Sequence, residues 1–157
     1  MRRAVRVIRK GSFAAGGDED RIILDFDERY RRRAMLFTEN RRAVLLNLDE
    51  VTHMRDGDAL VLTDDSLLLI RAKREPLLEI TAPEPVRLIV IAWHLGNRHL
   101  PVQFERSALR IRADDVIAQM VRGLGGEVCA LSAPFDPEGG AYGHAEAEHA
   151  RLMDEFA

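Results

Sequence analysis

The chain has 157 residues, of which 46% are hydrophobic and 31% charged, and its net charge is −3. This balance predicts a globular protein with a buried core and excludes a disordered chain. No apolar run reaches the roughly 18 residues that a membrane helix needs, and MRRAVRVIRK at the start does not resemble a signal peptide. We therefore expect a cytoplasmic protein with no membrane partner.

The first half of the chain predicts strands and no helix. Apolar or alternating segments of strand length are separated by turn residues throughout this half. The predicted strands are residues 3–9, 21–26, 34–37, 43–48, 59–62 and 66–72. We expect a β-rich N-terminal domain over residues 1–75.

Four arginines gather in RYRRR at residues 29–33. Such a cluster can bind phosphate, but it lacks the interleaved aromatic residues of a single-strand binder, and Asp25, Asp27 and Glu28 precede it. A solvated strand face is the favoured interpretation, and we expect no nucleic-acid partner. The alternative, a nucleic-acid site at RYRRR, predicts binding to any duplex that weakens strongly with salt.

The pattern changes after KREP at residues 73–76, where we expect the boundary between two folding units. Pro85 is expected to begin a helix and Gly96 to end it in the left-handed conformation. Asp114 is expected to cap a second helix, which Gly125 and Gly126 end. The predicted strands of this half are 77–81, 101–104, 108–111 and 127–131.

The order β-α-β-β-α-β is that of a ferredoxin-like domain. The sequence therefore predicts an α+β protein, in which the β-rich N-terminal domain is followed by a ferredoxin-like domain at 76–143 and a tail at 144–157.

The first predicted helix is apolar on almost every side. A helix that lies on one face of a sheet needs only an apolar stripe, so part of this surface requires another partner. We expect that partner to be a second copy of the chain, in a homodimer. The apolar residues are Val86, Leu88, Ile89, Val90, Ile91, Ala92, Trp93 and Leu95.

Two histidines, His94 and His99, flank the expected helix end in AWHLGNRHLPVQF. They are five residues apart, which excludes the i, i+4 chelate of a helical metal site. His94 is interpreted as a core or interface histidine, whereas His99 stands past the helix end. A two-fold axis through the apolar face would bring two copies of His99 together.

The remaining candidates receive structural interpretations. His53 is expected to be structural or solvated, and Cys129, the only cysteine, is expected to be a small buried residue. No G-x-S-x-G, H-E-x-x-H or phosphate-binding glycine motif is present, so we expect no enzyme.

Three segments resemble the urease accessory protein UreE family, a family of nickel metallochaperones. They are WHLGNRHLPVQ at 93–103, RGLGGEV at 122–128 and APFDPEGGAYGH at 133–144, and MRDGD at 54–58 and APEP at 82–85 extend the resemblance. The family implies a head-to-head dimer that binds nickel through the last histidine of GNRH, here His99. It also implies His144 and His149 of the tail as further metal ligands.

The resemblance implies a chaperone that carries Ni²⁺ as cargo during urease maturation, with Zn²⁺ or Cu²⁺ as possible competitors. The implied partners are urease accessory proteins, including the maturation GTPase, and the urease apoprotein complex. The alternative from another class is a non-enzymatic adaptor whose β-rich half binds peptides at a strand edge, with incidental metal binding. Such an adaptor would keep its partners in the presence of a chelator.

Overall fold

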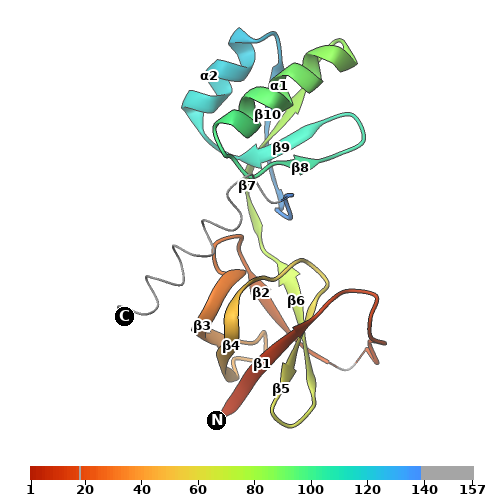
Figure 1. Ribbon diagram of the computed structural model, residues 1–157, viewed down its shortest axis with the longest axis vertical. Helices are drawn as coiled ribbons and strands as arrows, with labels where there is room; N and C mark the ends of the chain where they lie inside the picture. Colours follow the sequence, from red (N-terminus) through yellow and green to blue (C-terminus); the bar gives the residue numbers. More distant parts are fainter. Residues whose placement is uncertain (18, 139–157) are drawn as a thin grey trace. The chain divides into compact units, whose positions relative to one another are not determined.

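The computed structural model describes residues 1–17 and 19–138. The chain divides into two compact units, and the boundary lies between Lys73 and Arg74 (Figure 1).

The N-terminal unit is a six-stranded sheet, in which all six predicted strands are confirmed. The strands are β1 (Arg2–Ile8), β2 (Asp20–Leu24), β3 (Tyr30–Phe37), β4 (Ala43–His53), β5 (Ala59–Leu62) and β6 (Leu67–Ala72). Their order in the sheet is β2-β6-β5-β1-β4-β3, so β2 and β3 are its edges.

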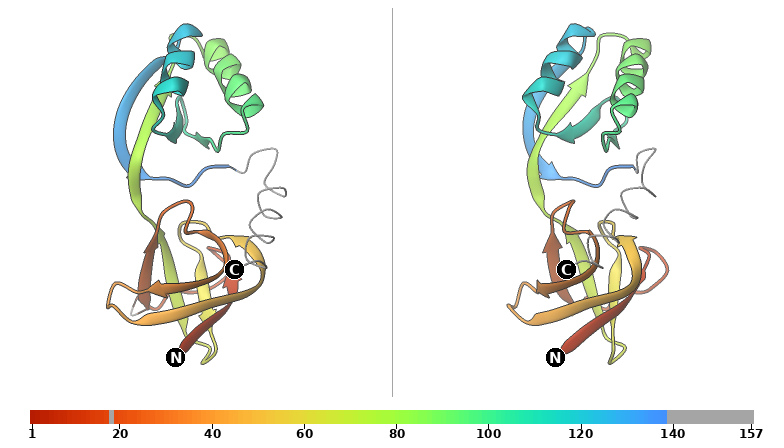
Figure 2. Two further views of the ribbon diagram at one scale, coloured as in Figure 1. Left: turned by 90° about the vertical axis from the view of Figure 1, so that its left-hand side faces the viewer. Right: turned by 60° about the vertical axis from the view of Figure 1, so that its left-hand side comes forward.

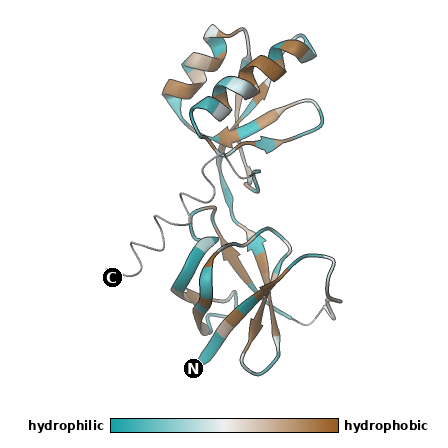
Figure 3. Ribbon diagram, viewed as in Figure 1, coloured by the Kyte–Doolittle hydropathy of each residue, from teal (hydrophilic) through white to brown (hydrophobic). Residues whose placement is uncertain are grey.

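Strands β3 and β4 are both longer than predicted. An irregularity in their pairing between Arg31 and Arg33 lets the ladder continue as far as the pair Tyr30 and His53. Most of RYRRR therefore lies within β3. Alternate residues of these strands face a core that includes Val44 and Leu46, and Figure 3 shows the hydrophobic stretches of the strands.

Among the described residues of this unit, two charged side chains are buried. The Asp58 carboxylate accepts hydrogen bonds from Arg9 Nη1 at 2.7 Å, from the Lys10 amide at 3.0 Å and from the Arg55 amide at 2.9 Å. Arg29 is fully buried, and its Nη1 donates to the Met54 carbonyl at 3.2 Å. The interpretation of RYRRR as a solvated face is thus wrong for its first arginine, which joins the turn before β3 to the end of β4.

The C-terminal unit has the predicted β-α-β-β-α-β order. Its elements are β7 (Arg74–Thr81), α1 (Pro85–Asn97), β8 (Gln103–Phe104), β9 (Leu109–Arg112), α2 (Asp115–Gly123) and β10 (Glu127–Pro134). The sheet order β10-β7-β9-β8 and two helices on one face of the sheet (Figure 2) confirm the α+β, ferredoxin-like expectation. Strand β7 begins three residues before the predicted start at 77, because Arg74 already pairs with Pro134 of β10.

The core of this unit lies between the helices and the sheet. Ile80 of β7, Ile91 and Leu95 of α1, and Val121 of α2 are fully buried there. Cys129 is exposed, so the expectation of a buried cysteine is wrong. Its neighbour Val128 packs against the core, and alternation along β10 turns the cysteine side chain to the opposite face. Neither helix among the described residues has the length and hydrophobicity that a bilayer span requires.

Candidate metal-binding site at the end of helix α1

Helix α1 ends differently from the prediction. Gly96 lies inside the helix, and the left-handed conformation belongs to His99, with φ of 59°. The His99 amide donates to the Gly96 carbonyl at 3.0 Å, and the Leu100 amide donates to the Leu95 carbonyl at 3.3 Å. These two bonds define a Schellman motif, in which His99 occupies the position that glycine usually takes.

Helix α2 ends in the same motif with a glycine in place of the histidine. The Gly125 amide donates to the Arg122 carbonyl at 3.0 Å, the Gly126 amide donates to the Val121 carbonyl at 2.9 Å, and Gly125 has φ of 87°. A side chain in the left-handed conformation costs about 1–2 kcal/mol relative to the right-handed one. The α1 motif therefore holds His99 in a backbone conformation that a residue with a side chain disfavours. The α2 motif does not have this cost, because glycine occupies the position.

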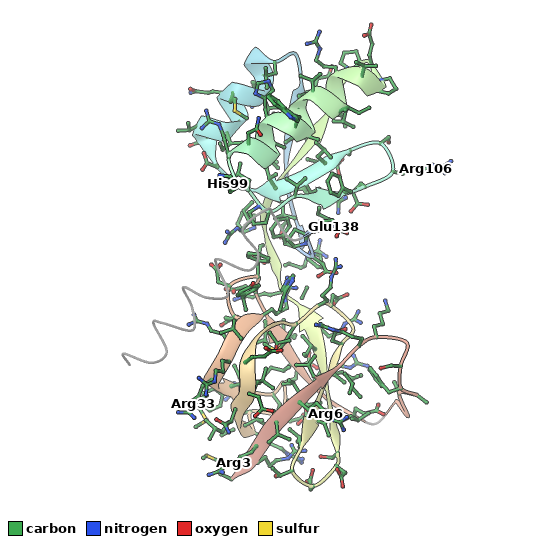
Figure 4. All side chains as sticks on the ribbon, viewed as in Figure 1. Arg3, Arg6, Arg33, His99, Arg106 and Glu138 are labelled. Atoms are coloured by element: carbon green, nitrogen blue, oxygen red, sulfur yellow. The ribbon has the colours of Figure 1, made fainter. Side chains whose placement is uncertain are left out.

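The residues on either side of His99 fix its place. Leu95 is fully buried, and Leu100 packs against the same core. His99 itself is exposed, so its imidazole is presented at the surface from a backbone that is held on both sides (Figure 4). Imidazole is a good ligand for Ni²⁺, Cu²⁺ and Zn²⁺, which makes His99 a candidate ligand.

The other histidines have different surroundings. His94 is half-buried and meets the Trp93 ring edge to face, with ring centroids 5.2 Å apart. His53 is half-buried, with its ring centroid 5.7 Å from that of Phe26 and 5.4 Å from that of Tyr30, which confirms its structural interpretation. His144 and His149 lie outside the described residues. Within residues 1–17 and 19–138, no three His, Cys, Asp or Glu side chains are grouped so that they could hold a metal ion.

An apolar stripe on α1 leads toward His99. Val86, Ile89 and Trp93 follow one another at spacings of three and four residues and are 68%, 68% and 65% exposed. Beside the stripe, Ile89 and Phe104 of β8 line a groove of about 470 Å³ between α1 and the loop that joins β8 to β9. The surplus of apolar surface predicted for this helix is therefore confirmed.

Comparison with known families covers both units. Residues 4–73 match the model of the UreE urease accessory protein N-terminal domain, and residues 75–155 match that of its C-terminal domain. The chain belongs to the UreE urease accessory protein family.

Individual UreE relatives support the assignment. The urease accessory protein UreE of Bradyrhizobium sp. (strain BTAi1) is 50% identical over 155 residues, which are 99% of this chain and 74% of that protein. The UreE of Rhodopseudomonas palustris (strain HaA2) is 55% identical over 123 residues, and that of Beijerinckia indica subsp. indica is 44% identical over 149 residues. The match spans 78% of this chain and 57% of the Rhodopseudomonas protein.

Membership of the UreE family gives the chain a role in urease maturation. It is an accessory protein of the chaperone kind, and the expectation of a non-enzyme is confirmed.

The segment between β9 and α2 contains no histidine. Arg112 and Ala113 precede the helix, and Asp115 is its first residue. The neighbouring Asp114 carboxylate accepts a hydrogen bond from the Ile117 amide at 3.0 Å, which makes Asp114 the expected N-terminal cap of α2.

The feature that sequence reasoning missed is the Schellman motif that contains His99. Its signal is present, because Leu95 and Leu100 have the spacing of the hydrophobic pair that accompanies such a motif. Gly96 led to the wrong prediction, because a glycine near the end of a helix is usually the residue that terminates it.

Proposed function

We propose that this chain is a cytoplasmic metallochaperone that binds Ni²⁺ and delivers it during maturation of the urease active site. The proposal rests on the position of His99. Its imidazole is exposed, and its backbone is held by the Schellman motif at the end of α1. The family supports the urease context, and the chemistry of imidazole supports the metal.

The proposed site is shared by two chains. A two-fold axis through the apolar stripe of Val86, Ile89 and Trp93 would place the same stripe of a second copy against it. Because His99 follows the end of this helix, the same axis would bring two imidazoles to one metal ion. The homodimer would bury the exposed stripe and complete the site at once.

A site with few protein ligands suits a delivery protein. Two imidazoles bind Ni²⁺ while its other coordination positions remain available to exchangeable ligands, so the ion can pass to a partner. His144 and His149 are proposed as further ligands from the tail. Zn²⁺ and Cu²⁺ also accept imidazole and are the expected competitors. The proposed recipients are the urease accessory proteins, including the maturation GTPase, and the urease apoprotein complex.

Nickel stoichiometry tests the proposal. Equilibrium dialysis of the full chain should give one tightly bound Ni²⁺ per two chains, and a chelator should remove it. His99→Ala should abolish tight binding and leave the dimer intact, because apolar packing does not need the metal. His94→Ala, a control that removes the histidine inside α1, should bind nickel like the unaltered chain.

Two results would contradict the shared site. One is a tight Ni²⁺ ion on every chain instead of every second chain. The other is tight binding that survives in His99→Ala.

A further inference from the structure

The segment after β10 connects the two edge strands of the C-terminal sheet. Strand β10 is one edge of the order β10-β7-β9-β8, and it ends at Pro134. Four residues later, the Glu138 amide donates to the Val102 carbonyl at 2.9 Å, immediately before β8 at the opposite edge. Residues 135–138 therefore carry the chain from one edge of the sheet to the other, and we call them the strap.

Gln103 ties the strap to β8 through its side-chain amide. The Asp136 amide donates to Gln103 Oε1 at 2.9 Å, and Gln103 Nε2 donates to Glu105 Oε1 at 2.6 Å. The two partners need opposite groups, because a backbone N–H requires an acceptor and a carboxylate requires a donor. Glutamine supplies both from one side chain, which neither glutamate nor leucine does.

An ion-pair network holds Glu105, the partner of Gln103. Arg110 Nη1 lies 3.5 Å from Glu105 Oε1, and Arg110 Nε lies 2.9 Å from Glu79 Oε2. Arg110 also pairs with Gln103 on one side and with Glu79 on the other. Its side chain is 25% exposed, so solvent screens the network only in part. Gln103 is therefore positioned from β7 and β9 as well as from its own strand.

Burial holds the strap as well. Phe135 is fully buried and Pro137 is buried, whereas Glu138 is exposed. The proline ring also fixes φ and so restricts the backbone of the strap. Side-chain packing and hydrogen bonds thus act together, and the exposed end at Glu138 is the point from which the chain continues toward the tail.

The strap ends within reach of His99. Its partner Val102 follows His99 by three residues, which span at most about 11 Å, and the Cα atoms of an antiparallel pair lie about 5 Å apart. His144 follows Glu138 by six residues in the sequence, and six residues span up to about 20 Å. His99 and Glu138 lie at the same end of the C-terminal unit (Figure 4). A tail that starts at Glu138 is therefore long enough to bring His144 to His99.

We propose that Gln103 is a positioning residue of the nickel site, which acts through the strap by starting the tail beside His99, so that His144 binds the same ion. The proposal rests on the nickel site proposed above. Without the strap, the tail would start at Pro134, on the far side of three strand spacings of about 4.8 Å. A longer tether lowers the effective concentration of the ligand that it carries, so nickel would bind less tightly.

A double-mutant cycle in the full chain tests the proposal. Gln103→Leu removes both hydrogen bonds of the side-chain amide, and His144→Ala combined with His149→Ala removes the tail ligands. In titration calorimetry with Ni²⁺, Gln103→Leu should weaken binding about twofold to fivefold when the tail histidines are present. It should leave the affinity unchanged when they are absent, whereas a purely structural role would weaken binding equally in both backgrounds.

Two further variants are controls for the same titration. Gln119→Leu makes the same replacement at an exposed position of α2 and should bind nickel like the unaltered chain. Gln103→Glu combined with Glu105→Gln should restore most of the affinity that Gln103→Leu loses. In this pair a carboxylate at position 103 accepts from the Asp136 amide, and an amide at position 105 supplies the donor.

A measurement without metal tests the path of the chain by itself. Arg98→Cys and Gly143→Cys, in a Cys129→Ser background, place one thiol next to His99 in the sequence and the other next to His144. Oxidised glutathione should join the two thiols in a disulfide, which peptide mass spectrometry detects.

The rate of this cross-link should depend on the strap. Gln103→Leu should slow it about twofold to fivefold. Arg122→Cys in place of Arg98→Cys is the control and should react more slowly, because α2 leads into the start of β10 whereas the strap leaves its end.

Several results would overturn the proposal. They are an equal effect of Gln103→Leu with and without the tail histidines, no effect in either background, unchanged nickel affinity after loss of both tail histidines, or a cross-link whose rate Gln103→Leu does not alter. Failure of the nickel site itself has a different result, which is tight binding that survives in His99→Ala.

Discussion

At the scale of single residues, both helices of the C-terminal unit end in the same backbone motif, but different residue types occupy its left-handed position. Gly125 has a left-handed conformation that costs glycine little, whereas His99 has the same conformation with a side chain. A Cβ at Gly125 would come no closer than 3.5 Å to Arg87 Cδ, so the two positions differ in backbone preference and not in crowding. The histidine is therefore retained at a cost in stability.

Exchange of these residues should change stability in opposite directions. His99→Gly should stabilise the C-terminal unit by about 0.5–1 kcal/mol, since relief of the left-handed penalty exceeds the entropy that glycine adds to the unfolded chain. Gly125→Ala should destabilise it by about 1 kcal/mol. Thermal unfolding measures both, and His99→Gly should also lose tight nickel binding. A lower melting temperature for His99→Gly would show that its side chain stabilises the fold.

At the scale of elements, α1 has two different apolar faces. Ile91 and Leu95 are buried against the sheet, while Val86, Ile89 and Trp93 remain exposed. Helix α2 offers a comparison, because Val116 is an apolar residue with 67% exposure that stands alone on its surface. A single exposed side chain is ordinary, whereas a stripe is typical of an interface.

A charge on the α1 stripe should therefore break the proposed dimer. Ile89→Glu should give a folded monomer in sedimentation velocity, because the carboxylate would be desolvated in an apolar contact. It should also lose the shared nickel ion. Val116→Glu introduces the same charge at an equally exposed site and should remain dimeric. A dimer that persists in Ile89→Glu would place the interface elsewhere.

At the scale of the whole molecule, each unit has a core of its own. One core lies among the strands β1 to β6, and the other lies between α1, α2 and the four-stranded sheet. The family match changes from the N-terminal to the C-terminal domain at the same point, with residues 4–73 in the first and 75–155 in the second. The proposed metal site belongs to the second of these units.

Two fragments test this division. Residues 74–157 and 74–143 should both fold, because all strands of the second sheet and both helices lie within them. The shorter fragment should bind nickel more weakly, since it lacks His144 and His149, but should retain one ion per dimer through His99. Near-UV circular dichroism and calorimetry measure these properties. A molten fragment would contradict the independence of the unit, and equal nickel affinity would remove the tail histidines from the proposed ligand set.

The candidate site followed from the sequence only in part. The GNRH segment and its resemblance to the UreE family selected His99, and the apolar surplus of α1 predicted an exposed face. The position of the left-handed residue was wrong, because Gly96 has a local preference for a helix stop that core packing of Leu95 and Leu100 overrides.

The sequence by itself determined the number, type and order of the elements, because apolar periodicity and turn residues act over short distances. It also determined the family. Only the tertiary structure decided the burial of side chains that depends on contacts between segments far apart in the chain. Burial of Arg29 rests on its contact with Met54, and exposure of Cys129 rests on which face of β10 is turned to the helices. These features arise from pairing and packing between distant segments, which local propensities do not encode.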